Sequence, residues 1–165
     1  MTLTLRDSAQ LISDPENLNS SVLEVFETML GVARDAIESG PSEPGMGTAE
    51  SVTAVVGFGG ILSGACVVTC DESSARQIAA LITGMEFNSL DDVVKDAMGE
   101  ICNMVAGTWK SRVPELAASC GLSVPAVISG RDYNLHLHSP EFSILHVYRF
   151  DQTRFQVSIV CDQLL

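Results

Sequence analysis

Three polar residues in the middle of the chain have types and a spacing that suit chemistry: Asp96, Glu100 and Asn103. On an α-helix, intervals of four and three residues place these side chains on one narrow stripe, over about two turns. Hydrophobic residues fill the opposite arc of the same helix, so the stripe faces outward. Carboxylates pair with cations, and an amide both donates and accepts hydrogen bonds. The plain alternative is an ordinary solvated helix face.

Two features of the helix favour more than a solvated face. Asn is a poor choice for the interior of a helix, yet Asn103 lies there. Gly107 lies on the same stripe and Gly99 lies at its edge, and a glycine inside a helix costs about 1 kcal/mol relative to alanine. Because small residues leave room for a close approach, we predict that a partner covers this surface and contacts Gly99 and Gly107.

The helices that hold and surround this stripe can be outlined from hydrophobic spacing and caps. Proline and glycine at residues 40–45 end the first of them, and Gly84 ends the second. The predicted helices are a first one from a cap at Asn17 or Asn19 to about Glu38, a short one at 75–82 capped by Asp71 or Ser73, and the stripe helix, capped by Ser89 and ending at about Arg112.

Hydrophobic runs predict β-structure in two parts of the chain, with a hairpin turn at Gly59 and Gly60. The predicted strands lie at 51–58, 61–70, 122–128, 133–138, 142–150 and 155–161, the last as an edge strand. This order of elements predicts an α+β domain, in which a mostly antiparallel sheet has about three helices packed on one face. We expect a single domain, 1–165, with residues 1–16 as an N-terminal extension of unclear role.

Composition excludes some classes of partner. The 165 residues include 9 Lys and Arg against 21 Asp and Glu, a net charge of −12. That field repels nucleic acid and disfavours an anionic membrane surface. No run of 18 apolar residues is present, and the N-terminus lacks the cationic start and apolar middle of a signal peptide. We therefore expect a cytoplasmic protein that binds neither nucleic acid nor membrane.

The cysteines and histidines each have two interpretations. The five cysteines form no CxxC pair, and in a reducing compartment they are typical of small buried hydrophobic residues rather than of a zinc site. His136 and His138 lie two apart on a predicted strand, and His146 on the next strand would share their face. Three histidines could bind zinc. The alternative is a half-exposed sheet face, where histidine is ordinary.

Two stretches of the chain resemble a known family. Residues 96–103, DAMGEICN, resemble the signature of the CheC, CheX and FliY phosphatases: Asp or Ser, three residues, Glu, two residues, Asn, and a Pro about twenty-two residues later. Pro125 is the candidate for the last position, one residue short of the usual spacing. Residues 99–107, GEICNMVAG, and residues 22–31, VLEVFETMLG, are similar to CheX sequences. The likeness extends from about Asn19 to Cys161 and predicts a CheC/CheX-like fold.

The resemblance implies an activity and roles for the site residues. The family's phosphatases hydrolyse the phospho-aspartate of a CheY-like receiver domain, which brings its own Mg²⁺, so no metal or cofactor is expected from this chain. Asn103 would place the attacking water, and Glu100 would pair with the receiver's active-site lysine. Asp96 would contact the receiver's edge or hold Glu100 in place. CheC-like relatives carry the signature twice, whereas Leu30 follows Glu27 here where an amide would be needed, so one site is expected.

Two further expectations accompany this resemblance. CheX relatives dimerise by joining sheets, which predicts a homodimer. An alternative function is a receiver-binding or motor adaptor module without hydrolysis, against which the intact pair of Glu100 and Asn103 argues. The phosphatase would act in chemotaxis or in a related two-component pathway.

Overall fold

The computed structural model describes residues 5–41, 51–136 and 140–164. Its helices are α1 (Leu5–Ser13), α2 (Pro15–Leu30), the 3₁₀ turn η1 (Arg34–Ala36), α3 (Glu72–Thr83), α4 (Asp92–Ser111) and α5 (Pro114–Ser119). Its strands are β1 (Glu38–Gly40), β2 (Ser51–Gly60), β3 (Leu62–Asp71), β4 (Cys120–Leu122), β5 (Ala126–Gly130), β6 (Phe142–Phe150) and β7 (Thr153–Leu164).

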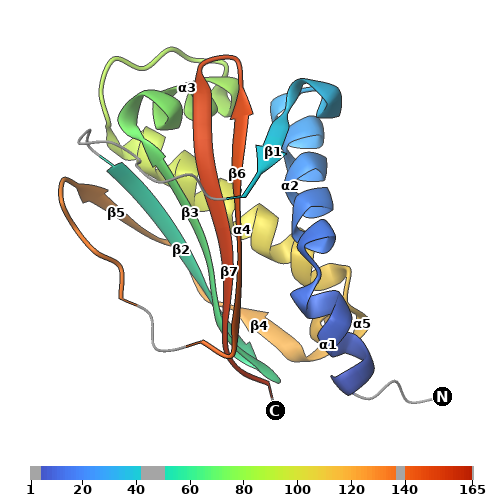
Figure 1. Ribbon diagram of the computed structural model, residues 1–165. Coiled ribbons are helices and arrows are strands. Elements are labelled where there is room, and N and C mark those ends of the chain that lie inside the picture. The colour runs from blue at the N-terminus through green and yellow to red at the C-terminus, as the bar shows by residue number, and fades with distance from the viewer. Residues whose placement is uncertain (1–4, 42–50, 137–139, 165) are drawn as a thin grey trace.

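All seven of these strands join one antiparallel sheet, in the order β1-β6-β7-β3-β2-β4, with β5 also paired to β2. The long helices α2, α3 and α4 pack on one face of the sheet, and α4 runs across β2 and β3 (Figure 1). The predicted α+β architecture is therefore confirmed, with two short helices, α1 and α5, added to the predicted three.

The core lies between the sheet and these helices. Strand residues on the helix side are buried because side chains alternate between the two faces of a strand, as in Phe155, Val157 and Ile159 of β7, all 0% exposed. Phe26 of α2 stacks on Phe155, with ring centroids 4.4 Å apart and an interplanar angle of 4°. Ile12 is 0% exposed, so α1, within the predicted N-terminal extension, contributes to the same core.

Several predicted boundaries are wrong for local reasons. The first helix ends at Leu30 rather than about Glu38, because Gly31 adopts a left-handed conformation, φ 68°, that closes the helix. Its cap is Asp14, and the cap of α4 is Asp91 rather than Ser89. The predicted cap Asp71 and the stop at Gly84 are confirmed for α3.

The strand predictions also need three corrections. β7, predicted as an edge strand, lies inside the sheet between β6 and β3. The predicted strand 122–128 is two short strands, β4 and β5, separated by residues 123–125. Residues 133–136 form no strand, and the rest of that predicted strand, including His138, lies outside the described residues.

Candidate active site on helix α4

The helix that carries the signature is fixed at its beginning and along its buried face. The Asp91 side chain accepts a hydrogen bond from the Val94 backbone N–H at 3.0 Å, which satisfies one of the free donors of the first turn. Further along, Trp109 is 0% exposed and its ring lies 5.2 Å from that of Phe58 on β2. The side chains buried on this face are Val94, Ala97, Met98, Ile101, Cys102, Val105, Ala106 and Trp109. Helix α4 is therefore a rigid support for the opposite face.

That opposite face carries the predicted stripe. Asp96 and Glu100 are exposed, and Asn103 is half-buried beside them. Within the described part of the chain, these three side chains make no hydrogen bond and no ion pair. A carboxylate and an amide without partners, one turn apart on a fixed helix, are available to a second molecule. The geometry thus brings the three residues together as the sequence predicts, while their roles stay predictions.

The two glycines of the stripe have different surroundings. Gly99 is buried: a Cβ there would lie 3.3 Å from Pro125 Cβ and 3.4 Å from Val127 Cγ2. Packing within the chain therefore favours glycine here, because a Cβ would fit only if Pro125 shifted by a few tenths of an ångström. This reason differs from the predicted one of leaving room for a partner. Gly107 is half-exposed, and a Cβ there would meet Leu122 Cδ1 at 3.8 Å, an ordinary contact. Space alone does not require glycine at this second position.

Beneath the stripe, α4 rests on the sheet through buried thiols. The Cys102 thiol lies 3.4 Å from the Cys66 carbonyl and 3.5 Å from the Ala54 carbonyl, to which it can donate. The neighbouring Cys102 thiol and burial raise the pKa of the Cys66 thiol. All five cysteines are free and buried, which confirms the predicted structural role. A neutral buried thiol is a poor nucleophile.

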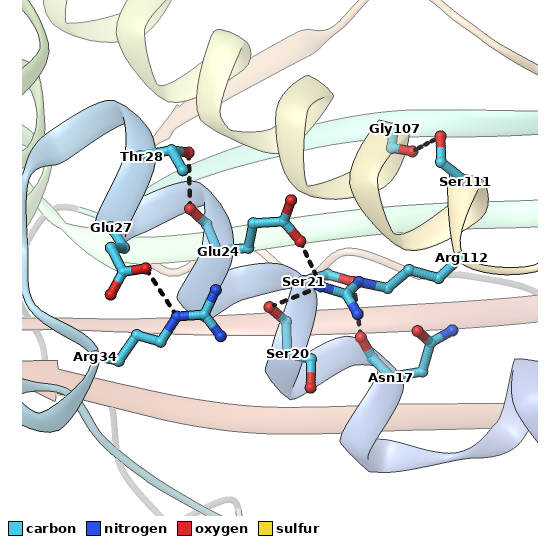
Figure 2. A network of polar contacts seen from close by, with 10 residues as sticks. All are labelled: Asn17, Ser20, Ser21, Glu24, Glu27, Thr28, Arg34, Gly107, Ser111 and Arg112. Atoms are coloured by element: carbon cyan, nitrogen blue, oxygen red, sulfur yellow. Dashed lines mark hydrogen bonds and ion pairs between the residues drawn. The ribbon is translucent and has the colours of Figure 1, made fainter.

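The C-terminal end of α4 is tied to two neighbouring elements. Lys110 Nζ donates to the carbonyls of Cys120 at 2.6 Å and Ala117 at 3.1 Å, which holds α5 and the start of β4 against the helix. Arg112 reaches across to α2, where it pairs with the Glu24 carboxylate and lies 3.5 Å from the Ser20 carbonyl (Figure 2). These contacts join the C-terminal end of α4 to α2, α5 and β4.

At Glu27, where a second signature was considered, helix α2 offers no pair of the same kind. Glu27 is occupied by Arg34, with Nε to Oε1 at 3.0 Å (Figure 2). Leu30, three residues later, is 7% exposed and belongs to the core. Both facts agree with the single site expected from the sequence.

The predicted histidine site has no support among the residues described. His136 lies outside any strand, and His146 lies on β6, on the helix side of the sheet opposite Val157. No group of three or more His, Cys, Asp or Glu side chains in residues 5–41, 51–136 and 140–164 is arranged to hold a metal ion. In the same ranges, no helix is long and apolar enough to span a membrane.

Comparison with known proteins agrees with this fold and this helix. The family model for the chemotaxis phosphatase CheX matches residues 52–146, which include all of α4. A CheY-P phosphatase CheX from Thermotoga maritima is 28% identical over 127 residues, covering 74% of this chain and 81% of the relative. The chain is therefore defined as an α+β domain of the chemotaxis phosphatase class.

More particularly, the chain belongs to the CheX family. The crystal structure of the chemotaxis protein CheX from Vibrio vulnificus superposes with a TM-score of 0.70 at 26% identity, covering 88% of this chain and 94% of that one. A CheX–CheY–BeF₃–Mg²⁺ complex from Borrelia burgdorferi gives a TM-score of 0.73 at 21% identity, with 92% and 99% covered. At that identity the second likeness concerns the fold alone.

Proposed function

We propose that this domain hydrolyses the phospho-aspartate of a CheY-like receiver, in chemotaxis or a related two-component pathway. The observation that carries the proposal is the free pair on α4: Glu100 and Asn103 are adjacent, face outward, and have no partner among the described residues. Family membership supports phosphatase chemistry, and a related CheX has been crystallised with CheY. An exposed pair on a convex helix suits a protein substrate, which can close over it.

Asn103 would orient the attacking water. An amide oxygen accepts a hydrogen bond from water and the amide N–H₂ donates one, without adding negative charge beside the phosphoryl group. The water oxygen bonds to phosphorus while the bond from phosphorus to the aspartyl oxygen breaks, which yields inorganic phosphate and the free aspartate. Because the acyl phosphate is already reactive, placing this water in line is the main contribution required.

Glu100 would supply docking charge rather than a proton. A carboxylate near a phosphoryl group is repelled unless it finds a cation, and the receiver's active-site lysine would provide one. The absence of an ion pair to Glu100 within the described residues leaves it available for that contact. Mg²⁺ would come with the receiver. Asp96, one turn earlier, would meet the receiver's edge.

The decisive experiment follows phosphate loss from labelled CheY-type receivers of the source organism. Wild-type protein should accelerate the loss, and Asn103→Ala should reduce that acceleration on the order of a hundredfold, because the water is no longer held in line. Gln77→Ala removes an exposed amide from α3 and is the matched control, expected to behave as wild type. Binding of a receiver without accelerated loss would replace the phosphatase with the adaptor function.

A further inference from the structure

A short segment of the chain lies along α4 beside the catalytic stripe. At one end, Leu122 Cδ1 is 3.8 Å from the position of a Cβ on Gly107; at the other, Pro125 Cβ is 3.3 Å from that of Gly99. The segment 122–125 therefore runs antiparallel to the helix. Gly107, Asn103 and Gly99 are spaced four residues apart on one side of α4, so the middle of the segment passes the turn of Asn103.

The segment is held firmly to the sheet on its other side. The Ser123 backbone N–H donates to the Gly57 carbonyl at 2.9 Å, and the Gly57 N–H donates to Ser123 Oγ at 2.8 Å. Ser123 Oγ also lies 3.1 Å from the Val124 carbonyl, to which it can donate. In the gap between β4 and β5, which both pair with β2, Ser123 Oγ thus takes the place of a backbone carbonyl as the acceptor from Gly57. With Pro125 packed on Gly99, the residues on both sides of Val124 are fixed.

Between these anchors, the Val124 side chain is 86% exposed, the largest value among the large hydrophobic residues described. A lone exposed valine on a surface needs no special explanation. This one differs because it is held on a braced segment that passes the helical turn of Asn103, the residue that would orient the attacking water. A partner that closes over the turn of Asn103 would therefore come close to the segment that presents Val124.

We propose that Val124 is a docking residue for the receiver. Its side chain inserts into an apolar hollow on the receiver, beside the receiver's phosphorylation site. The proposal rests on the proposed phosphatase function and names the chemistry of the partner's surface. An apolar side chain presented by a rigid segment loses little conformational entropy on binding, so the area it buries contributes to affinity. A receiver with a charged side chain facing Val124 would be disfavoured, since that charge would be desolvated against a valine. The residue would thereby select among the receivers of one cell.

The control residue for this proposal is Ile128, four residues after Val124. Val127 faces Gly99 on the helix side of the sheet, and strand alternation places Ile128 on the opposite face, where it is 40% exposed. Ile128 is therefore a β-branched, exposed residue of the same strand region that a receiver seated on α4 does not reach. Both Val124→Ser and Ile128→Ser are surface changes, so both variants should unfold within a few degrees of wild type.

The test measures two quantities for each variant: binding of a CheY-type receiver held in its phosphorylated form by beryllofluoride and Mg²⁺, and kcat for loss of phosphate at saturating receiver. Val124→Ser should raise the Kd about tenfold and leave kcat unchanged, as the loss of one buried valine contact predicts. Ile128→Ser should change neither quantity by more than about twofold.

The outcomes separate the docking proposal from the phosphatase proposal. If wild type hydrolyses and Val124→Ser binds like wild type, the docking role is refuted and the phosphatase stands. If wild type binds without hydrolysis and Val124→Ser binds about tenfold more weakly, the docking role stands and the phosphatase is refuted. If no receiver binds wild type at all, both proposals are overturned.

Discussion

Helices α2 and α4 lie side by side on one face of the sheet, and each carries a glutamate on its exposed side. On α4, Glu100 is followed three residues later by Asn103, and neither has a partner among the described residues. On α2, Glu27 pairs with Arg34 at 3.0 Å, and the residue three positions later is Leu30, buried in the core.

This difference shows how two similar helices in one layer acquire different tasks. Helix α4 buries one face, and on the other face Asp96, Glu100 and Asn103 have no partner among the described residues. Helix α2 uses its apolar residues to cover β6 and β7, through Phe26, and two of its carboxylates, Glu24 and Glu27, to pair with neighbouring arginines. The two positions differ in residue type and in burial, since Asn103 is half-buried on the outer side of α4 and Leu30 is 7% exposed in the core.

The largest effect that tests this comparison comes from giving α2 the missing amide. Leu30→Asn, made in the Asn103→Ala background, should lower the free energy of unfolding by about 3 kcal/mol, because a buried leucine is lost and an amide is buried without a planned partner. It should restore no phosphatase activity, since Glu27 is held by Arg34. Urea unfolding and phosphate release measure the two parts.

Met29→Asn is the matched control for that experiment. Met29 is the preceding residue and is 52% exposed, so the change should cost less than about 1 kcal/mol. Recovery of phosphate release by Leu30→Asn would contradict the comparison, because it would mean that α2 can supply a second site.

The sequence predicts much of this fold because its signals are local. Hydrophobic spacing defines α4, valine-rich runs define β2 and β3, and Gly84 ends α3. The interior position of β7 is different, since strand order depends on pairing with β3 and β6, which are distant along the chain. An alternation of apolar and polar residues is the same on an edge strand and on a central strand whose second face is exposed to solvent.

For the candidate site too, the sequence predicts the local part and misses the part that depends on distant residues. The stripe of Asp96, Glu100 and Asn103 follows from helical periodicity alone. The environment of Gly99 does not, because the neighbour that crowds this position is Pro125, which reaches α4 only after the chain has turned through α5 and β4. For the same reason, no local pattern predicts that the segment carrying the exposed Val124 runs along α4.

A smaller effect distinguishes the two glycines of α4. Gly99→Val should lower the free energy of unfolding by about 1–3 kcal/mol, because the new side chain overpacks against Pro125 and Val127. Gly107→Ala should raise it by about 0.5–1 kcal/mol, since alanine is the better helix former and the space is open. Thermal and urea unfolding of both variants measure whether each change lowers or raises the free energy of unfolding.

Receiver binding by the same variants sharpens the meaning of Gly107. If a partner approaches α4 closely at this position, Gly107→Ala should bind the receiver several-fold more weakly even though the protein is more stable. Unchanged affinity in the more stable variant would remove Gly107 from the proposed receiver surface.

The smallest effect concerns the ion pair that joins the two helices. Arg112 and Glu24 are 35% and 43% exposed, so Arg112→Ala should lower the free energy of unfolding by less than about 1 kcal/mol, and added salt should reduce the difference. Arg34→Ala, which breaks a similarly exposed pair within the α2 region, is the control and should cost about as much. Phosphate release should change by no more than about twofold, because α4 is placed by its buried face, which includes Trp109. A large loss of phosphate release with Arg112→Ala, but not with Arg34→Ala, would mean instead that α2 positions the catalytic helix through this contact.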